Sequence, residues 1–267
     1  MADSLDPVSA PPSAVRAAVV VLAAGDGRRV GTGTNKVLLP LAGVPVLAWS
    51  LRQIVKVEYL DQVVVTVREQ DRAVVEQTLR RYVAAHDFTI VRGASTRHGS
   101  EHNALLTLAE SIDSGQIDVV AIHDAARPLA PAGLFTSVVD AAAQHGGALP
   151  VRPEPAVLLR VPSSLRESAA AALRGANSRL VGVQTPQAFR AAPLLDAYRQ
   201  AARDGFEGTD TASCIEKYTD LDIHCVPSPA TNLKVTYPED LAVAERLLGG
   251  LSAGSAGSGE GLEQPQG

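Results

Sequence analysis

Short apolar runs alternate with helical patterns along most of the chain, and this alternation restricts the fold to a few classes. Four of the runs are AAVVVLAA, QVVVTV, FTIV and DVVAIH, at residues 17–24, 62–67, 88–91 and 118–123. Each is followed by a segment whose apolar residues recur at helical spacing. Strands that are apolar on both faces are typical of parallel sheets covered by helices on both sides. The sequence therefore predicts an α/β fold with a mostly parallel sheet.

The alternation changes beyond Pro150. Residues 151–183 contain two possible strands, VLLRV and RLVGV, on either side of a polar segment. This pattern favours a protruding β-arm over another strand-helix-strand unit. The α/β pattern then resumes, and we expect two helices, a strand and a last helix at 191–203, 209–218, 221–226 and 238–248.

Both ends of the chain are poor in apolar residues. Residues 1–15 and 249–267 are rich in Pro, Gly and Ser, which predicts disordered tails. The length of 267 residues suits one large α/β domain or two small ones. Because no internal repeat is visible between the tails, we expect a single domain at 16–248 that carries the arm at about 151–183.

The charge balance and the cysteines argue against several classes of protein. The formal net charge is −5, and Lys and Arg cluster in no run longer than a pair, which does not favour a nucleic-acid partner. Cys214 and Cys225 lack the spacing of a disulfide framework or a zinc knuckle. The sequence has neither a basic-then-apolar leader nor a run long enough to cross a bilayer. We therefore expect a cytoplasmic protein that binds neither nucleic acid nor a membrane.

The segment VVVLAAGDGRRVGTGTNK, residues 19–36, combines glycines and other small residues with positively charged side chains. Loops of this kind at the end of a strand bind phosphate in α/β folds, because small residues let backbone amides approach the anion. Two familiar forms do not match. The dinucleotide fingerprint needs a glycine where Val30 stands, and the P-loop needs Gly-Lys-Ser/Thr where the chain reads Asn35-Lys36-Val37. Taken alone, the loop is either a phosphate site of another kind or a glycine-rich turn.

Four later motifs decide between these interpretations. The first loop, LAAGDGRR...NK, is similar to the P-A-A-G-x-G-x-R...P-K signature of nucleotidyltransferases that activate sugar or polyol phosphates. The motifs IHDAARP, GVQTPQAF, GTDTAS and NLKVTYPEDLAVAE, which begin at residues 122, 182, 208 and 232, then resemble the 2-C-methyl-D-erythritol 4-phosphate cytidylyltransferase family. The five motifs occur in order between about residues 17 and 248. The resemblance implies a nucleotide-diphospho-sugar transferase fold, with a Rossmann-like sheet and a β-arm.

This resemblance also implies a reaction. The family transfers a cytidylyl group from CTP to 2-C-methyl-D-erythritol 4-phosphate with Mg²⁺ and releases pyrophosphate, a step of isoprenoid precursor biosynthesis. Such a displacement must align two anions that repel each other and stabilise charge on a five-coordinate phosphorus. By the resemblance, the catalytic cations are Arg29 and Lys36, and the backbone that contacts the nucleotide belongs to Ala23, Ala24 and Gly25. The alternative for the two cations is a solvated, exposed pair.

Asp124 follows the apolar strand VVAIH directly, at the edge where open parallel sheets hold ligands. A carboxylate there can hold Mg²⁺ that bridges phosphates. The resemblance places the metal at Asp124, whereas the alternative is an acid that caps the next helix. Arg127 is expected to pair with this carboxylate.

The segment RGASTRHGSEHN, residues 92–103, resembles the family's G-G-x-x-R-x-x-S, which contacts cytosine and ribose. Gly93, Arg97 and Ser100 match, and Ala94 replaces the second glycine. The same residues also read His-x-x-Glu-His, the signature of one class of zinc peptidase. Because a glycine inside the signature disfavours a continuous helix, we do not expect zinc.

For the acceptor phosphate, the resemblance implies a site formed by Thr185, Thr209, Asp210 and Lys234. Several departures lie on this side. The family's Asp-Thr and the following Lys are not evident in the arm, and an expected arginine is Asn177, for which Arg174 or Arg179 is a substitute. Leu22, Asn35 and Val37 also replace two common prolines and a glutamine in the first motif.

Three functional hypotheses follow. The first is the cytidylyltransferase, expected as a homodimer because the arm embraces a second subunit in this family. The second is a paralogous enzyme with another acceptor such as ribitol 5-phosphate. The third is a CTP-binding protein with little turnover.

Overall fold

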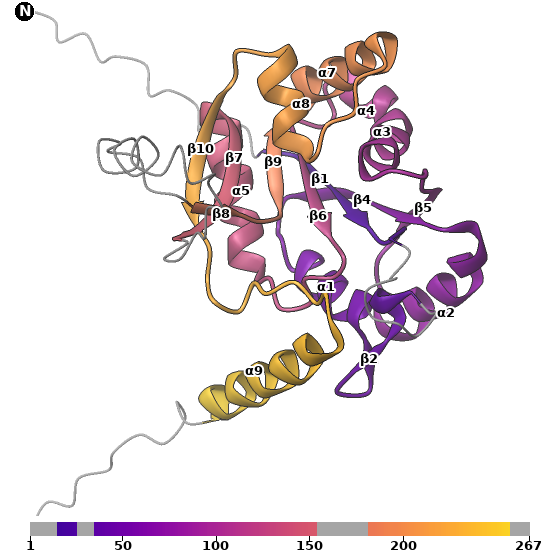
Figure 1. Cartoon of the computed structure of the whole chain (residues 1–267), viewed down its shortest axis with the longest axis vertical. Helices are drawn as coiled ribbons and strands as arrows, with labels where there is room; N and C mark the ends of the chain where they lie inside the picture. Colours follow the sequence, from indigo (N-terminus) through magenta and orange to yellow (C-terminus); the bar gives the residue numbers. More distant parts are fainter. Residues whose placement is uncertain (1–14, 26–34, 154–180, 257–267) are drawn as a thin grey trace, which may run out of the picture.

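The computed structural model describes residues 15–25, 35–153 and 181–256. One mixed sheet forms its centre, with strand order β10-β7-β9-β6-β1-β4-β5, and β8 pairs with β7 (Figure 1). The strands are β1 (Ala17–Leu22), β4 (Leu60–Val67), β5 (Thr89–Arg92), β6 (Val119–Asp124), β7 (Gly146–Pro153), β8 (Val181–Val183), β9 (Gln187–Arg190) and β10 (Asp222–Pro227). A separate hairpin joins β2 (Pro40–Leu41) and β3 (Val44–Pro45).

Helices connect these strands in the predicted alternation. The α-helices are α1 (Val46–Ile54), α2 (Arg72–Tyr82), α3 (Arg97–Thr107), α4 (Ala109–Asp113), α5 (Ala132–His145), α7 (Ala191–Asp204), α8 (Thr211–Tyr218) and α9 (Pro238–Ala256). Two short 3-10 helices, η2 (Lys36–Leu38) and η3 (Glu69–Asp71), lie in loops. None of the described helices is long and apolar enough to span a membrane.

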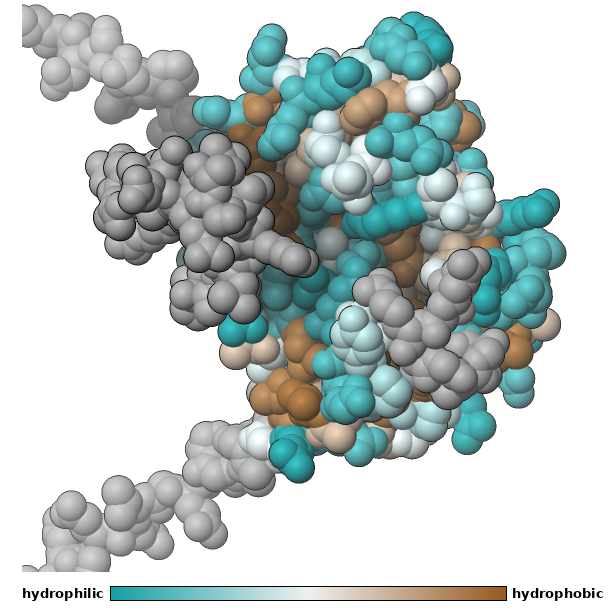
Figure 2. Space-filling view, in the orientation of Figure 1, coloured by the Kyte–Doolittle hydropathy of each residue, from teal (hydrophilic) through white to brown (hydrophobic). Residues whose placement is uncertain are grey.

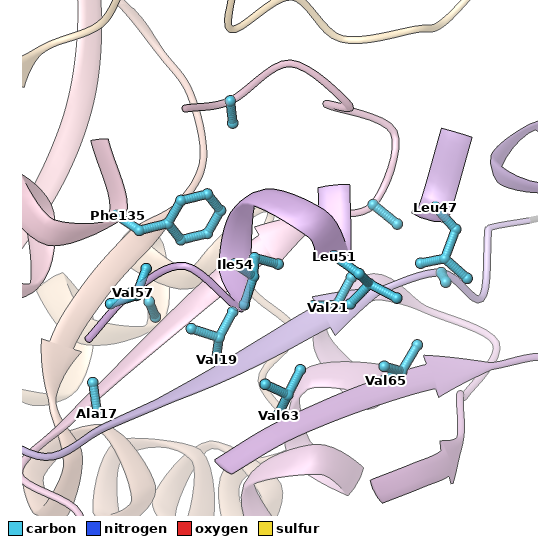
Figure 3. Packing of buried hydrophobic residues seen from close by; sticks show 14 of the residues in the cluster. Ala17, Val19, Val21, Leu47, Leu51, Ile54, Val57, Val63, Val65 and Phe135 are labelled. Carbon is cyan, nitrogen blue, oxygen red and sulfur yellow. The ribbon is translucent and has the colours of Figure 1, made fainter. Parts of the chain in front are cut away.

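The central strands are buried on both faces, as their continuous apolar sequences predict. On β1, Val19 and Val21 pack with α1, α2 and α5 on one side of the sheet, while Ala18 and Val20 pack with α3, α4, α7 and α8 on the other. Figure 3 shows the first of these layers, where Leu51 and Ile54 of α1 lie over Val19, Val21 and the neighbouring strand. Side chains that alternate across a strand reach both layers, so a strand between two helical layers must be apolar throughout.

The predicted α/β fold with a mostly parallel sheet and helices on both faces is confirmed. β1 pairs in parallel with β4 and β6, and β5 and β10 also lie in parallel with their neighbours. β9 runs antiparallel to both β6 and β7. Of the predicted arm, residues 154–180 lie outside the described residues, and the two ends that are described form the antiparallel pair β7–β8.

Several helix boundaries differ from the predictions, most of them by one or two residues. Helix α3 begins at Arg97 rather than near Ser100, because the Thr96 side chain accepts the Gly99 N–H at 3.0 Å and caps the helix there. Helix α9 continues to Ala256, so the first residues of the segment predicted as a C-terminal tail are helical.

Candidate active site

The candidate residues gather at the carboxyl ends of β1, β5 and β6. Asp124 is the last residue of β6 and lies opposite Leu22, the last residue of β1. The Ala125 N–H donates to the Leu22 carbonyl at 3.1 Å, which holds the two strand ends together. Figure 2 shows hydrophilic residues in the middle of this face, over the ends of β6 and β1. This is the edge at which open parallel sheets bind their ligands.

Three cations surround the Asp124 carboxylate. Its Oδ2 lies 2.6 Å from the Lys234 Nζ and 3.8 Å from the Arg127 Nε, and its Oδ1 lies 3.6 Å from an Arg97 nitrogen. Burial alone raises the pKa of Asp124, but these positive charges outweigh it and hold the pKa below its ordinary value. The carboxylate is therefore ionised at neutral pH. The expected pairing of Arg127 is present, and Asp124 does not cap α5, whose N-cap is Pro131.

The Asn35 side chain anchors the chain where the first loop ends and η2 begins. Its amide donates to the Ala23 carbonyl at 2.7 Å and to the Asp71 carboxylate at 2.9 Å, and its oxygen accepts the Val37 N–H. Arg68 donates to both oxygens of the same Asp71 carboxylate. Asn35 thus caps η2 and places Lys36, the first residue of η2, beside the end of β1. Arg29 lies outside the described residues.

Gly93 brings β5 and the first loop into close contact. A Cβ at position 93 would lie 2.3 Å from the Ala24 Cβ, so only glycine fits there without a shift of the backbone. Ala94, which replaces the second glycine of the family motif, fits because it faces Gly99. A Cβ added at Gly99 would lie 2.7 Å from the Ala94 Cβ. The Ser100 hydroxyl accepts the Ala94 N–H at 3.0 Å and fixes this turn. The structure therefore brings Ala24, Gly93 and Ser100 together, and exposed Gly25 follows Ala24.

Two of the four candidate acceptor residues, Thr185 and Lys234, contact Asp124. The Thr185 hydroxyl accepts the Asp124 N–H at 3.1 Å, and Lys234 bonds to the Asp124 side chain. Asp210 caps α8 and accepts a hydrogen bond from Gln187 at 3.1 Å. Thr209 is exposed and precedes Asp210. Asn177, Arg174 and Arg179 lie outside the described residues.

A model of the 2-C-methyl-D-erythritol 4-phosphate cytidylyltransferase (IspD) family matches residues 17–250. The chain belongs to this family. A curated relative of that name from Bacillus mycoides (strain KBAB4) is 32% identical over 230 residues, which cover 86% of this chain and 96% of the relative. Its counterpart from Geobacillus kaustophilus (strain HTA426) is 32% identical over 231 residues, with 86% and 95% covered. The resemblance inferred from the five motifs is thereby confirmed.

Solved structures of the family share the fold. The crystal structure of 2-C-methyl-D-erythritol 4-phosphate cytidylyltransferase from Thermus thermophilus is 26% identical and has a TM-score of 0.62, with 87% of this chain and 98% of that chain covered. The 4-diphosphocytidyl-2C-methyl-D-erythritol synthase from Anaerococcus prevotii DSM 20548 has a TM-score of 0.70 at 21% identity, with 88% and 96% covered. The fold of this chain is thus that of the cytidylyltransferases.

The His-x-x-Glu-His signature has a structural use in this family member. Gly99 does not interrupt α3, so the expected break in the helix at this signature is wrong. The side chains are engaged elsewhere: His98 stacks on Tyr198 with ring centroids 4.5 Å apart, and Glu101 contacts Arg97, Tyr198 and Thr211. Within the described residues, no group of three or more His, Cys, Asp or Glu side chains could hold a metal ion.

Sequence reasoning missed the role of Glu101. Its side chain is fully buried, accepts hydrogen bonds from the Tyr198 and Thr211 hydroxyls and pairs with Arg97. Burial raises the pKa of Glu101, and Arg97 and the two hydroxyls oppose that rise. The signal that could have found the pair is the spacing, because residues four apart on a helix share a face.

His123 is a second buried polar residue that the sequence did not single out. It precedes Asp124, is fully buried, and its ring meets Phe135 edge-on at a centroid distance of 4.8 Å. Its Nδ1 lies 3.4 Å from the Thr185 hydroxyl oxygen. Burial lowers the pKa of His123 to about 3, so the imidazole is neutral at pH 7.

We predict a pH-dependent loss of stability from His123. An unfolded histidine has a pKa of about 6.5, so below that pH protons bind the unfolded chain in preference to the folded one. The contribution of neutral His123 to the free energy of unfolding is fully present above about pH 6.5. It is lost as the pH falls toward the pKa of His123 in the folded protein. Urea denaturation should show a loss of about 1 kcal/mol from this residue between about pH 6 and pH 5. Over the same pH interval, the free energy of unfolding of the variant His123→Asn should fall by about 1 kcal/mol less than that of the wild type. An equal fall in the two proteins would refute the prediction.

The second prediction concerns Gly93→Ala. The added methyl group cannot fit beside the Ala24 Cβ, so β5 or the first loop must move. We expect unfolding to become easier by about 1–3 kcal/mol and CTP to bind more weakly by at least about tenfold. Calorimetric titration with CTP measures the second effect. Gly133→Ala is the matched control, because nothing lies within 4 Å of its added Cβ. Wild-type affinity in Gly93→Ala would show that this contact does not shape the nucleotide site.

Proposed function

We propose that the chain transfers the cytidylyl group of CTP to 2-C-methyl-D-erythritol 4-phosphate, forming 4-diphosphocytidyl-2-C-methyl-D-erythritol and pyrophosphate. Its membership of the cytidylyltransferase family supports this activity. The structural observation that carries the proposal is the convergence of Arg97, Lys234 and Arg127 on Asp124, at the sheet edge where Ala24 meets Gly93. A polyanionic substrate fits a site in which positive side chains outnumber the acid.

The reaction is an in-line displacement at phosphorus. A phosphate oxygen of the acceptor forms a bond to the α-phosphorus of CTP, and the bond from that phosphorus to the bridging oxygen of pyrophosphate breaks. The reaction needs alignment and charge stabilisation rather than a covalent enzyme intermediate. We assign charge stabilisation on the triphosphate to Arg29 and Lys36, and binding of the acceptor phosphate to Lys234 with Thr185, Thr209 and Asp210.

Asp124 is the residue that fits Mg²⁺. Mg²⁺ is commonly held by one or two carboxylates while substrate phosphates and water supply the other oxygens. Asp124 is ionised and stands at the substrate edge of the sheet, so it offers a hard oxygen ligand where the phosphates would lie. When bound, the ion would neutralise phosphate charge during the displacement. Asp124 also pairs with Lys234 and Arg97, so its carboxylate links the candidate metal position to both cations.

The nucleotide side of the proposed site is formed by backbone. Ala23, Ala24 and Gly25 follow β1 without large side chains, and Gly93 leaves room beside Ala24. We assign contacts with cytosine and ribose to Gly93, Arg97 and Ser100. A homodimer formed through the arm and a cytoplasmic location remain predictions from the resemblance and the sequence.

Release of pyrophosphate tests the proposal directly. The purified chain is incubated with CTP, Mg²⁺ and either 2-C-methyl-D-erythritol 4-phosphate or ribitol 5-phosphate, and the nucleotide product is identified by mass. We expect product with the first acceptor. Product with ribitol 5-phosphate alone would show a paralogous enzyme, and CTP binding without product from either acceptor would show a protein that has lost turnover. The same assay without Mg²⁺ tests the metal requirement.

A further inference from the structure

Three side chains from three helices meet around the buried Glu101 carboxylate. We call the four residues the Glu101 cluster: Arg97, Glu101, Tyr198 and Thr211. The Tyr198 hydroxyl donates to one oxygen of Glu101, and the Thr211 hydroxyl donates to the other at 3.0 Å. The Arg97 guanidinium contacts the oxygen that Thr211 also reaches. Glu101 itself has no exposed surface. Both of its oxygens are therefore used inside the protein.

The cluster fixes the direction of the Arg97 side chain. One terminal nitrogen of its guanidinium lies on Glu101, and the other lies 3.6 Å from the Asp124 carboxylate. The guanidinium thus spans two carboxylates, one buried and one at the candidate metal position. A planar guanidinium that is paired with a carboxylate at each of its two terminal nitrogens has fewer orientations open to it than one with a single pair. The Arg97 side chain remains 28% exposed, so a substrate can still reach it.

The Glu101 carboxylate also bonds to Thr211, which lies next to the candidate acceptor residue Asp210. Thr211 is the first residue of α8 and follows Asp210, whose side chain caps that helix. Glu101 therefore connects α3, which carries the candidate nucleotide residues Arg97 and Ser100, with the first turn of α8. Placing a carboxylate in such a buried position is costly, and a group of similar size without charge would satisfy the packing at less cost.

We propose that Glu101 is a positioning residue for CTP, which acts by holding the Arg97 guanidinium at the nucleotide site. This inference rests on the proposed function, because Arg97 is assigned there to cytosine and ribose. Glu101 touches no substrate. Its effect on CTP passes through Arg97, and this separates it from a residue that only stabilises the fold.

The test compares Glu101→Gln with Arg97→Gln and with the double variant that carries both changes. Glutamine keeps the size of the side chain and can still accept a hydrogen bond from Tyr198, but it removes the charge that faces Arg97. We expect Glu101→Gln to raise the KM for CTP and the calorimetric Kd for CTP by about tenfold, with a smaller change in kcat. The double variant should bind CTP about as weakly as Arg97→Gln alone, because Glu101 has no further route to the nucleotide.

Two other variants complete the comparison. Glu110→Gln changes an exposed glutamate on α4 and should leave the KM for CTP and the melting temperature as in the wild type. Thr211→Val removes the hydroxyl that shares an oxygen of Glu101 with Arg97 and leaves both charges in place. It should shift the KM for CTP in the same direction by a smaller factor. This variant provides a result even if Glu101→Gln does not fold.

Three results would overturn the inference. One is a Glu101→Gln variant that melts earlier but keeps the wild-type KM and Kd for CTP. Another is a double variant whose Kd for CTP shows the full product of both single effects. The third is an unchanged KM for CTP in Thr211→Val. Failure of the proposed function is distinguishable, because the calorimetric titration needs no acceptor: a wild type that binds CTP and yields no product leaves the comparison of Kd values intact.

Discussion

Replacing Asp124 by asparagine should reduce turnover of CTP and 2-C-methyl-D-erythritol 4-phosphate by about 10³-fold. The substitution keeps the shape of the side chain and removes the charge on which Lys234, Arg97 and Arg127 converge. It also removes the carboxylate proposed to hold Mg²⁺. Steady-state kinetics at saturating CTP measures the loss. Lys234 and Arg97 are partly exposed, and the buried Arg127 keeps its hydrogen bond to the Asn232 carbonyl, so the cost in unfolding free energy should stay near about 1–3 kcal/mol.

The matched control for this variant is Asp113→Asn. Asp113 is an exposed acid that pairs with Arg199 at 2.8 Å, away from the carboxyl ends of the strands. It should leave turnover unchanged and cost little stability. Asp124→Asn with turnover within about tenfold of the wild type would refute the assignment of Asp124 to the reaction.

Replacing Lys36 by alanine should lower kcat by about 10²–10³-fold. Lys36 begins η2, and the Asn35 side chain anchors that turn to the Ala23 carbonyl and to Asp71. The anchored turn holds the Lys36 backbone in place before negative charge develops on the triphosphate. The loss should therefore appear in kcat rather than in the melting temperature, and single-turnover kinetics with bound CTP separates the chemical step from product release.

Two further lysine variants serve as controls for Lys36→Ala. Lys36→Arg keeps the positive charge and should recover part, but not all, of the lost rate, because a guanidinium differs from an ammonium in shape and hydration. Lys56→Ala changes an exposed lysine that follows α1 and should have no effect on kcat. A kcat for Lys36→Ala equal to that of the wild type would contradict the catalytic assignment.

The sequence predicts the layers of this fold well for a physical reason. A strand such as β1 has helices on both faces, so every residue from Ala17 to Val21 must be apolar, and the pattern is visible without knowledge of any partner. β9 has only four residues and inserts antiparallel between β6 and β7. Its position depends on pairing with strands far away in the sequence. A local pattern cannot show such pairing, and so β9 was not predicted.

The site likewise has features that the sequence could predict and features that depend on contacts between distant parts of the chain. The position of Asp124 at the substrate edge of the sheet could be predicted, because the end of a parallel strand marks that edge. The partners of Glu101 could not be predicted, because Tyr198 and Thr211 are separated from it by about one hundred residues and meet it only after α7 and α8 pack. Asn35 illustrates a substitution with a structural meaning, since its side chain performs by hydrogen bonds the stiffening that a proline provides by its ring.

The central claim is that one CTP molecule lies across the carboxyl ends of β1, β5 and β6. A crystal structure with CTP and Mg²⁺ tests it most directly. We expect the cytosine beside Gly93, the triphosphate alongside Lys36, and the metal on the Asp124 carboxylate, next to Lys234. A triphosphate and metal bound away from Asp124, with Gly93 and Lys36 facing solvent, would contradict it.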